Sequence, residues 1–379
     1  MRGPLRTGID SELNRMTTIT NRALNRALLA RQMLLAREET TAVDAITRLV
    51  ALQAQLARPP FVGLWTRVEA FRRAELTAAL NEHRVVRVTS LRGTLHLMTA
   101  ADYVALRGVL QPMLTRGMQG ILRDRATTLD MKTLEAEARK FFGKAPATFD
   151  ALRKHLEVKF AAGDERAMAY AIRTHLPLVQ VPTDAAWAFP AAASFTLADT
   201  WLSKQVSTAT RPADTLVLRY LAAFGPSTVA DAQAWSGLSP LREAFESLRP
   251  SLVTFRDERK RELFDIPTAP RPDPDTPAPV RFVPDFDNLV LSHDDRARVI
   301  AAEHRPRMTT KNLQVRATIL VDGMVAGTWK SERKRKTAVL VIEPFGVVAK
   351  RMRALLEAEG ESLLAFLEED ATNREIRWS

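Results

Sequence analysis

The stretch FGPSTVADAQAWSGLSP at residues 224–240 gives the strongest indication of the fold. It follows an amphipathic helical segment, and the dipeptide Gly225-Pro226 is a typical helix end. Thr228 and Asp231 have the spacing of a capping box, so the next helix should begin between them. The stretch therefore predicts two consecutive helices with a sharp break after the first.

The residues that follow predict a helix-turn-helix and then a hairpin. Ser239-Pro240 supplies an N-cap serine and a first-turn proline for a helix that should run from Pro240 to Leu248. Apolar residues at 252–255 and 263–264 flank the charged segment 256–261, which is typical of a hairpin with a basic tip. Helix, helix-turn-helix and hairpin, in this order, form a winged helix.

A second copy of this order lies earlier in the chain. The stretch FGKAPATF at residues 142–149 resembles the start of the first stretch, which indicates an internal repeat. For this copy we expect helices at 131–142, from about Thr148 and after Asp164. Strands should follow at 178–181 and 187–189.

A third copy lies nearest the N-terminus. We expect a long helix from about Thr20 to Glu38, a helix capped by Thr41, and a helix at 73–81. A hairpin over residues 86–97 should turn at Leu91-Arg92-Gly93, because apolar and polar residues alternate on either side of this tripeptide.

The C-terminal third has a different pattern. The proline-rich segment 267–279 is incompatible with a helix or a sheet ladder and reads as a stiff linker. Beyond it, Asp322-Gly323 lies between two apolar runs and is a strong hairpin signal. A further strand is expected at 338–343 and an amphipathic helix over 346–370.

These patterns predict a mainly α fold with small β hairpins, in which three tandem winged-helix modules precede a β-rich part. We place the modules at residues 16–125, 126–205 and 206–266, the linker at 267–279, and the C-terminal β-rich part with its closing helix at 280–379. Residues before Met16 read as a polar leader.

Composition favours a partner that carries negative charge. The 379 residues include 55 Lys and Arg against 44 Asp and Glu, a formal net charge of +11. Such a balance is expected of a protein that meets nucleic acid, although a genome rich in G and C also enriches arginine in every protein. We expect a cytoplasmic, nucleoid-associated protein, since no signal peptide or apolar run of membrane-spanning length is evident.

Several kinds of chemistry are excluded or disfavoured. The chain has no cysteine, which excludes disulfides, thiolate catalysis and cysteine-bound zinc. Its six histidines show no HxxxH spacing, so we expect neither a metal nor a cofactor.

The tripeptide Gln53-Ala54-Gln55 is the candidate catalytic motif. Gln53 falls where the periodicity of the helix capped by Thr41 predicts a buried apolar residue, and a buried amide needs partners. On a regular helix Gln53 and Gln55 would point about 200° apart. Because Pro59 and Pro60 disfavour helix at Arg58, we expect the helix to loosen at Gln53-Ala54-Gln55 and the two amides to converge there.

The chain resembles the AlkZ/YcaQ-like winged-helix DNA glycosylases from about Thr20 to its end. The stretches that carry the resemblance are LQAQLARPP (52–60), SLRGTLHLM (90–98), PDFDNLVLSHDDR (284–296) and VDGMVAGTW (321–329). The resemblance implies a C-shaped arrangement of three winged helices with a β-rich C-terminal part. It also implies a catalytic signature, Gln-Φ-Gln in one branch and Gln-Φ-Asp in the other, and Gln53-Ala54-Gln55 matches the first.

The expected activity is hydrolysis of the N-glycosidic bond of alkylated purines in duplex DNA, by a monomer without a cofactor. An N7-alkylated purine already carries positive charge, so its glycosidic bond is weak and two neutral amides that hold a water could suffice. A glutamine pair is a weaker base than glutamine with aspartate. The resemblance associates the Gln-Φ-Gln branch with bulky adducts and interstrand cross-links.

DNA contacts are expected at two hairpins. The outward face of the first should carry Arg92, Thr94 and His96. The second turn of the C-terminal part should be a basic run that clamps phosphates, with Lys330, Arg333, Lys334, Arg335 and Lys336. Each set could equally be polar surface at a solvated hairpin. Four acidic residues are interpreted as loop and cap residues rather than a cation site: Asp285, Asp287, Asp294 and Asp295.

Two other functions stay open. A winged-helix regulator or architectural protein would bind intact DNA, usually as a dimer on spaced half-sites, and would not catalyse. A protein–protein scaffold would show no salt-dependent binding to duplex DNA.

Overall fold

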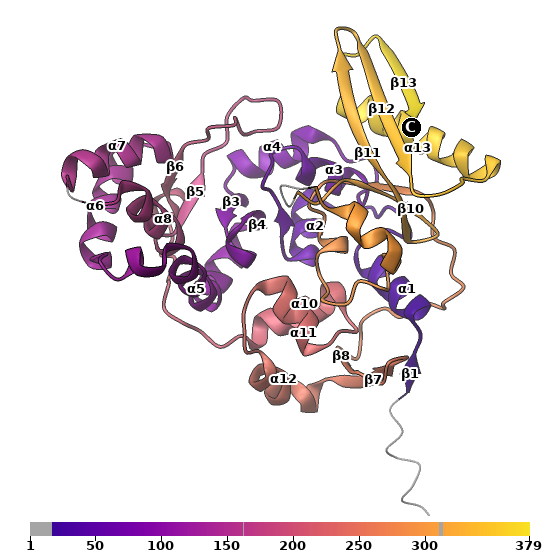
Figure 1. Ribbon diagram of the computed structural model, residues 1–379, viewed down its shortest axis with the longest axis horizontal. Helices are drawn as coiled ribbons and strands as arrows, with labels where there is room; N and C mark the ends of the chain where they lie inside the picture. Colours follow the sequence, from indigo (N-terminus) through magenta and orange to yellow (C-terminus); the bar gives the residue numbers. More distant parts are fainter. Residues whose placement is uncertain (1–16, 162, 311–313) are drawn as a thin grey trace, which may run out of the picture.

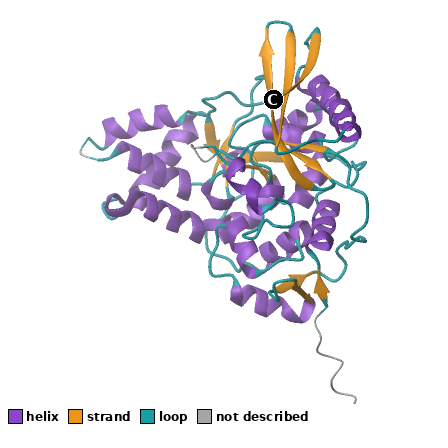
Figure 2. Cartoon of the chain, turned by 45° about the vertical axis from the view of Figure 1, so that its right-hand side comes forward, coloured by secondary structure: helices purple, strands orange, loops and turns teal. Residues whose placement is uncertain are grey.

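A computed structural model describes residues 17–161, 163–310 and 314–379. The expected leader and Met16 lie outside these residues. The fold is mixed α/β rather than mainly α, because the described residues contain one sheet of three strands and two of five. Figures 1 and 2 show a lobe of helices on one side and, on the other, a finger of long strands beside the C-terminal helix.

The first region ends at residue 125, the second region spans residues 126–205, and the third region spans residues 206–266. The first region contains β1 (Thr18–Ile19), α1 (Asn21–Arg31), α2 (Ala42–Leu49), β2 (Leu52–Gln53), α3 (Pro59–Trp65), α4 (Arg73–Asn81), β3 (Val85–Thr89), η1 (Leu91–Gly93), β4 (Leu95–Thr99), α5 (Ala100–Leu122) and the start of η2 (Arg123–Ala126).

The caps of the first region are confirmed, and one helix length is wrong. Thr41 caps α2 by accepting a hydrogen bond from the Asp44 amide at 3.1 Å. The helix expected to reach Glu38 ends at Arg31, because Met33 adopts a left-handed φ of 55° and Glu38 pairs instead with Val68.

In the second region the three expected helices are present, and one expected strand is misplaced. The elements are α6 (Met131–Lys144), α7 (Phe149–Lys159), α8 (Glu165–His175), β5 (Leu178–Gln180), β6 (Phe195–Leu197) and α9 (Ala198–Trp201). The strand predicted at 187–189 is absent, and β6 takes its place. The aromatic residue Trp187 packs edge-on against Phe61, with ring centroids 5.3 Å apart. The apolar residues at 187–189 therefore serve side-chain packing and do not form a strand.

The third region has the predicted order of elements: α10 (Asp214–Phe224), α11 (Val229–Ser236), α12 (Arg242–Leu248), η3 (Arg249–Ser251), β7 (Val253–Asp257) and β8 (Glu262–Asp265). The capping box of Thr228 and Asp231 is confirmed. Helix α12 begins at Arg242 rather than at Pro240. No helix or strand occurs in the linker 267–279, as expected.

The C-terminal part is built around the antiparallel strands β9 to β12. Its elements are β9 (Arg281–Val283), η4 (Asn288–Val290), η5 (Ala302–Met308), β10 (Thr318–Val321), β11 (Met324–Lys334), β12 (Thr337–Pro344), α13 (Lys350–Leu367) and β13 (Asn373–Trp378). Its sheet has the order β13-β12-β11-β10-β9. The Asp322-Gly323 turn and the closing helix are confirmed, and the parallel strand β13 was not predicted.

The first two regions share one sheet, with the order β2-β4-β3-β5-β6. Strand β3 of the first region pairs with β5 of the second, and Arg87 lies opposite Gln180. Every residue of β3 and β4 is buried. The predicted outward face of this hairpin is therefore wrong, because neighbouring strands and regions cover both of its sides.

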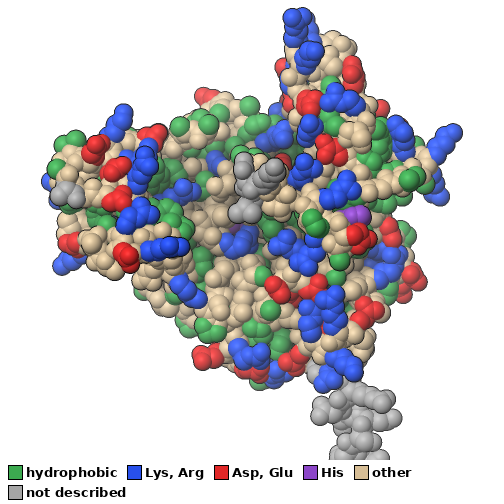
Figure 3. Space-filling view, in the orientation of Figure 1, with side chains coloured by type: hydrophobic (Ala, Val, Ile, Leu, Met, Phe, Trp, Pro, Cys, Tyr) green, Lys and Arg blue, Asp and Glu red, His purple; other side chains and the backbone are tan. Residues whose placement is uncertain are grey.

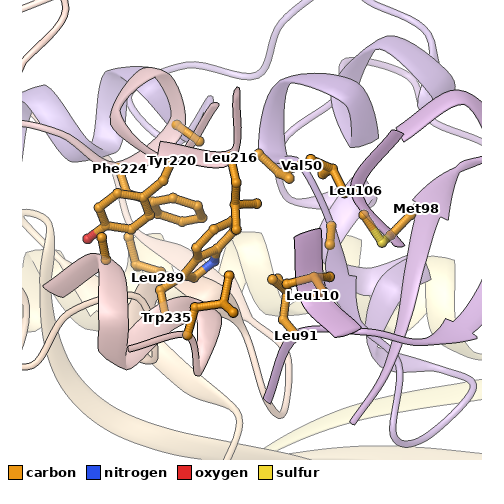
Figure 4. Close-up of a cluster of buried hydrophobic side chains, with 14 of the residues drawn as sticks. Val50, Leu91, Met98, Leu106, Leu110, Leu216, Tyr220, Phe224, Trp235 and Leu289 are labelled. Carbon is orange, nitrogen blue, oxygen red and sulfur yellow. The ribbon is translucent and has the colours of Figure 1, made fainter. Parts of the chain in front are cut away.

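The largest core cluster also joins regions that are distant in sequence. Figure 4 shows Leu91 and Met98 of the first region in the same cluster as Leu216 and Trp235 of the third and Leu289 of the C-terminal part. Among the described helices, none is both long enough and apolar enough to cross a membrane.

Candidate active site

Gln53 and Gln55 lie on non-helical backbone. Helix α2 ends at Leu49, and Val50 adopts a φ of 67°, so the helix has already ended before Gln53, where the sequence predicts only a loosening. Gln53 is then in β2, opposite His96 of β4, and Gln55 is in the bend that follows. The helical face predicted to carry Gln53 does not exist.

The two amides are held by one short segment of the first hairpin. The Oε1 atom of Gln53 accepts a hydrogen bond from Nη2 of Arg92 at 2.8 Å. The Oε1 atom of Gln55 accepts one from the backbone amide of Leu95 at 3.4 Å. Gln53 is 9% exposed, whereas Gln55 is open to solvent. The segment 92–95 therefore contacts both amides of the motif.

Arg92 orients the amide of Gln53. A guanidinium only donates hydrogen bonds, so the atom that it contacts must be the amide oxygen, and the amide nitrogen is left to donate elsewhere. The other guanidinium nitrogen, Nη1, donates to the carbonyl of Trp235 in α11. Burial lowers the pKa of Arg92 to about 10, with a further contribution from Arg296, so the group stays cationic at neutral pH.

Arg87 holds the backbone of the motif. Its Nε and Nη2 atoms donate to the carbonyl of Ala54 at 2.9 and 2.7 Å, and Nη2 also reaches the carbonyl of Gln55 at 3.3 Å. The guanidinium lies over the ring of Phe189, 4.8 Å from its centroid. Charge-assisted hydrogen bonds of this kind are about twice as strong as neutral ones.

The segment after β9 supports the motif from the interior. Nδ2 of Asn288 donates to the carbonyl of Ala51 at 2.5 Å. Next to it, Asp287 forms a buried two-point ion pair with Arg67 at 2.7 and 2.9 Å. The stretch 284–296, which carries part of the family resemblance, thus holds the backbone just before Gln53.

The interpretation of the acidic residues as loop and cap groups is confirmed for two of them. Asp287 caps η4 by accepting from the Leu289 amide, and Asp295 accepts from the Ala297 amide. Burial raises the pKa of Asp285, with Arg58 opposing the shift. Over the residues that the structure describes, no group of three or more His, Asp or Glu side chains could hold a metal ion.

His96 does not face outward, and Thr94 is half-buried. His96 is fully buried; its Nδ1 atom lies 3.1 Å from the carbonyl of Thr94, to which it donates, while Nε2 has no partner. Burial lowers the pKa of His96 to about 3, and the charge of Arg92 adds to the effect, so the ring is neutral. The hydroxyl of Thr94 donates to Leu91. All three hairpin residues predicted to touch DNA thus make contacts within the protein.

The basic run at 330–336 is only partly a turn. Strand β11 extends through Lys334 and pairs with β12, so only Arg335 and Lys336 form the connection. Lys330 is ion-paired with Glu332 at 3.0 Å, and Arg333 with both Glu368 and Asp370. The remaining cations, Lys334, Arg335 and Lys336, are exposed at the tip of the finger, where Figure 3 shows Lys and Arg side chains.

Sequence reasoning missed Arg87, Asn288 and a pocket of about 350 Å³ that opens beside Gln55. Arg87 alternates with Val86 and Val88, a pattern that is typical of a solvent-facing side chain. Strand β3, which carries Arg87, is covered by β5, whose Gln180 lies opposite Arg87, and nothing in the local sequence signals that pairing. Asn288 belongs to one of the stretches that carry the family resemblance.

Comparisons with known proteins agree with one another. A family model described as DNA glycosylase AlkZ-like matches residues 46–366. An interstrand DNA cross-link repair glycosylase of Streptomyces sahachiroi is 24% identical over 344 residues, which cover 84% of this chain and 88% of that protein. The structure of the Streptomyces sahachiroi DNA glycosylase AlkZ has a TM-score of 0.78 with 20% identity, over 96% of this chain and 100% of that one. The structural likeness shows a shared fold.

Proposed function

Because the chain belongs to the AlkZ-like DNA glycosylase family, whose members hydrolyse N-glycosidic bonds in DNA, we propose that it releases N7-alkylated purines and that Gln53 and Gln55 position the attacking water. The observation that carries the proposal is the fixed amide of Gln53. Its oxygen is occupied by Arg92, and its nitrogen is therefore left to donate a hydrogen bond, as to a water or a substrate oxygen.

The chemistry suits a pair of neutral amides. Alkylation at N7 places a positive charge on the purine, so the C1′–N9 bond breaks with its electron pair moving to the base, which leaves neutral. Positive charge develops on the sugar, as in glycoside hydrolysis, and a water held by the amides adds to C1′. The proton of that water passes to solvent, since an amide is too weak a base to retain it.

The substrate class extends to bulky adducts and interstrand cross-links in this proposal. The Streptomyces sahachiroi relative is named as a cross-link repair glycosylase, and this chain carries the glutamine form of the motif. We also interpret the first, second and third regions as three winged-helix modules of a monomer that lies on duplex DNA. The net charge of +11 favours such a partner.

The test is release of 7-methylguanine from methylated duplex DNA and unhooking of a cross-linked duplex, each followed by alkaline cleavage at abasic sites. Wild type should release the base, and Gln53→Ala and Gln55→Ala should lower the rate by about 100-fold or more, as loss of water positioning does. All three proteins should bind the duplex with affinities within about threefold, because most phosphate contacts are untouched.

Gln119→Ala is the matched control, because Gln119 is exposed on α5 and its side chain forms no hydrogen bond with the described residues. This variant should keep the wild-type rate. Release at the wild-type rate by both motif variants would remove the glutamine pair from the mechanism. No release by wild type from either substrate, with binding to intact duplex retained, would favour the non-catalytic regulator.

A further inference from the structure

The pocket beside Gln55 lies at the seam between the first and second regions. Its volume is about 350 Å³, and its walls come from β3 and β5 of the shared sheet, from α8 and from the start of α7. In Figure 1 these elements meet where the helical lobe joins the rest of the molecule. The pocket is therefore next to the candidate catalytic motif but is formed mainly by residues that the proposed mechanism does not use.

Two guanidinium groups face this pocket without a carboxylate to neutralise them. Arg87 and Arg173 both line it, and neither forms an ion pair within the part of the chain that the structure describes. Burial lowers the pKa of each, and the charge of Arg173 lowers the pKa of Arg87 further, to about 10. The acidic lining residue Asp150 is paired with Arg153, and its side chain is 75% exposed. Uncompensated positive charge at a partly buried site favours an anionic ligand.

The other walls agree with an anion. Helix α7 begins at the pocket with Thr148 as its N-cap, so the positive end of an 11-residue helix is directed there. Gln180 is 7% exposed, and its Oε1 atom has no hydrogen-bond partner. Because the two ends of an amide are interchangeable by a rotation, Gln180 can turn its NH₂ group toward a bound oxygen.

We propose that this pocket holds a phosphodiester of the DNA strand that carries the damaged nucleotide. The identity of the strand rests on the proposed function, whereas the anion site rests on the pocket itself. Two guanidiniums and a helix N-terminus match the charge and the several oxygens of a phosphate. An uncharged base in the same place would leave both guanidiniums desolvated and without a counter-charge.

This site has a consequence for catalysis. A phosphate fixed between Arg87 and Arg173 restrains the adjacent sugar beside Gln55, because only the few bonds of one nucleotide separate them. The contact carries no sequence information, as expected of an enzyme that recognises damage in any sequence. The phosphate contact also places no limit on the size of the damaged base, which suits bulky adducts.

The experiment is a methylphosphonate scan on a duplex with a central tetrahydrofuran abasic analogue. Each duplex replaces one phosphate near the analogue with a neutral methylphosphonate, and dissociation constants are measured for wild type and Arg173→Gln. Wild type should lose about tenfold in affinity at one linkage, in the range of a charge-assisted hydrogen bond. Arg173→Gln should lose about tenfold on the unmodified duplex and nothing further at that linkage.

Two further variants keep the test decisive. Arg166→Gln removes the same charge from an exposed position on the same helix, and its scan should match that of wild type. Arg173→Lys keeps the charge without the planar fork and should lie between wild type and Arg173→Gln. If Arg173→Gln still shows the wild-type loss at the sensitive linkage, the pocket does not hold that phosphate.

Free phosphate is separated from the phosphodiester by thermal unfolding in inorganic phosphate. Stabilisation of wild type but not of Arg173→Gln, together with a scan that is flat near the analogue, would overturn the DNA assignment in favour of a free anion. The proposed reaction is judged separately. If no base is released but one linkage is sensitive in the scan, the glycosylase mechanism is removed and the phosphate site stands. If base is released but the scan is flat, the phosphate site is removed and the glycosylase mechanism stands.

Discussion

At the scale of residues, Arg92 connects the candidate catalytic amide to a distant helix. One side of its guanidinium holds Gln53 and the other holds the carbonyl of Trp235. The neutral His96 lies beside it, with an imidazole nitrogen that has no partner. The environment of Gln53 is thus set by the partly buried Arg92 and the buried His96, whose protonation does not change near neutral pH.

Arg92→Met should slow base release far more than it weakens DNA binding. The methionine occupies a similar volume but leaves the Gln53 amide free to rotate, so the rate constant under single-turnover conditions should fall about 10- to 100-fold. The dissociation constant for duplex DNA should change by less than about threefold. Arg92→Lys should recover part of the rate. Equal losses of rate and affinity would instead indicate that Arg92 is a DNA contact.

The depressed pKa of His96 predicts acid sensitivity. The unfolded chain binds a proton at this residue near pH 6.5, whereas the folded protein resists protonation down to about pH 3. The free energy of unfolding should therefore be fully present above pH 6.5 and fall as the pH drops toward 3, by about 2 kcal/mol for this residue between pH 6.5 and 5. Denaturant titrations of His96→Gln should show a shallower pH slope, and an unchanged slope would contradict the prediction.

At the scale of elements, the turn between α11 and α12 packs directly on the turn that carries Arg92. Gly237 has a φ of 79°, and a Cβ atom there would lie 3.2 Å from Cα of Arg92 and 3.1 Å from a side-chain atom of Met113. A residue with a side chain is strained in this conformation and must also push the Arg92 turn away. The close approach explains why the third region can reach the candidate active site of the first.

Gly237→Ala should lower both stability and activity. We expect a loss of about 1–2 kcal/mol in the free energy of unfolding from the left-handed backbone, with an added loss of rate as Arg92 shifts. Gly120→Ala is the control, since a Cβ there meets nothing within 4 Å and the residue lies inside α5. That control should be neutral or stabilising by up to about 1 kcal/mol. Equal behaviour of both variants in thermal unfolding and base release would refute the packing argument.

Sequence patterns predicted local structure better than they predicted which surfaces are covered. The predicted caps at Thr41 and Thr228 and the predicted helix start near Thr148 all depend on short-range hydrogen bonds, and all three are confirmed. The exposed face assigned to the first hairpin is wrong, because its burial depends on strands that pair over long distances. For the candidate site, the tripeptide could be identified through resemblance, whereas its support by Arg87 could not.

At the scale of the whole molecule, buried ion pairs join regions that are far apart in sequence. Arg31 of α1 pairs with Asp265 at the end of the third region, and Arg67 of the first region pairs with Asp287 of the C-terminal part. All four side chains are at most 2% exposed. Together with the shared core, these pairs predict that the described regions unfold in one cooperative transition.

Asp287→Ala should be strongly destabilising. It leaves the guanidinium of Arg67 buried without a counter-charge, which costs about 3–5 kcal/mol in comparable cases, and it also removes the cap of η4 beside Asn288. Glu82→Gln breaks the exposed pair with Arg84 and should cost less than about 1 kcal/mol. Chemical denaturation followed by tryptophan fluorescence measures both. A cost below 1 kcal/mol for Asp287→Ala would show that the pair does not join the regions.

The sheet shared by the first and second regions determines whether the protein or the DNA changes shape when the two meet at a damaged site. A hinge between β3 and β5 would have to break ladder hydrogen bonds and open a buried seam, so the walls on either side of Gln55 keep a constant separation. The protein does not close around its substrate at this seam. We therefore expect the double helix to bend or unstack on binding, and damaged steps that deform at a lower energy to be admitted first.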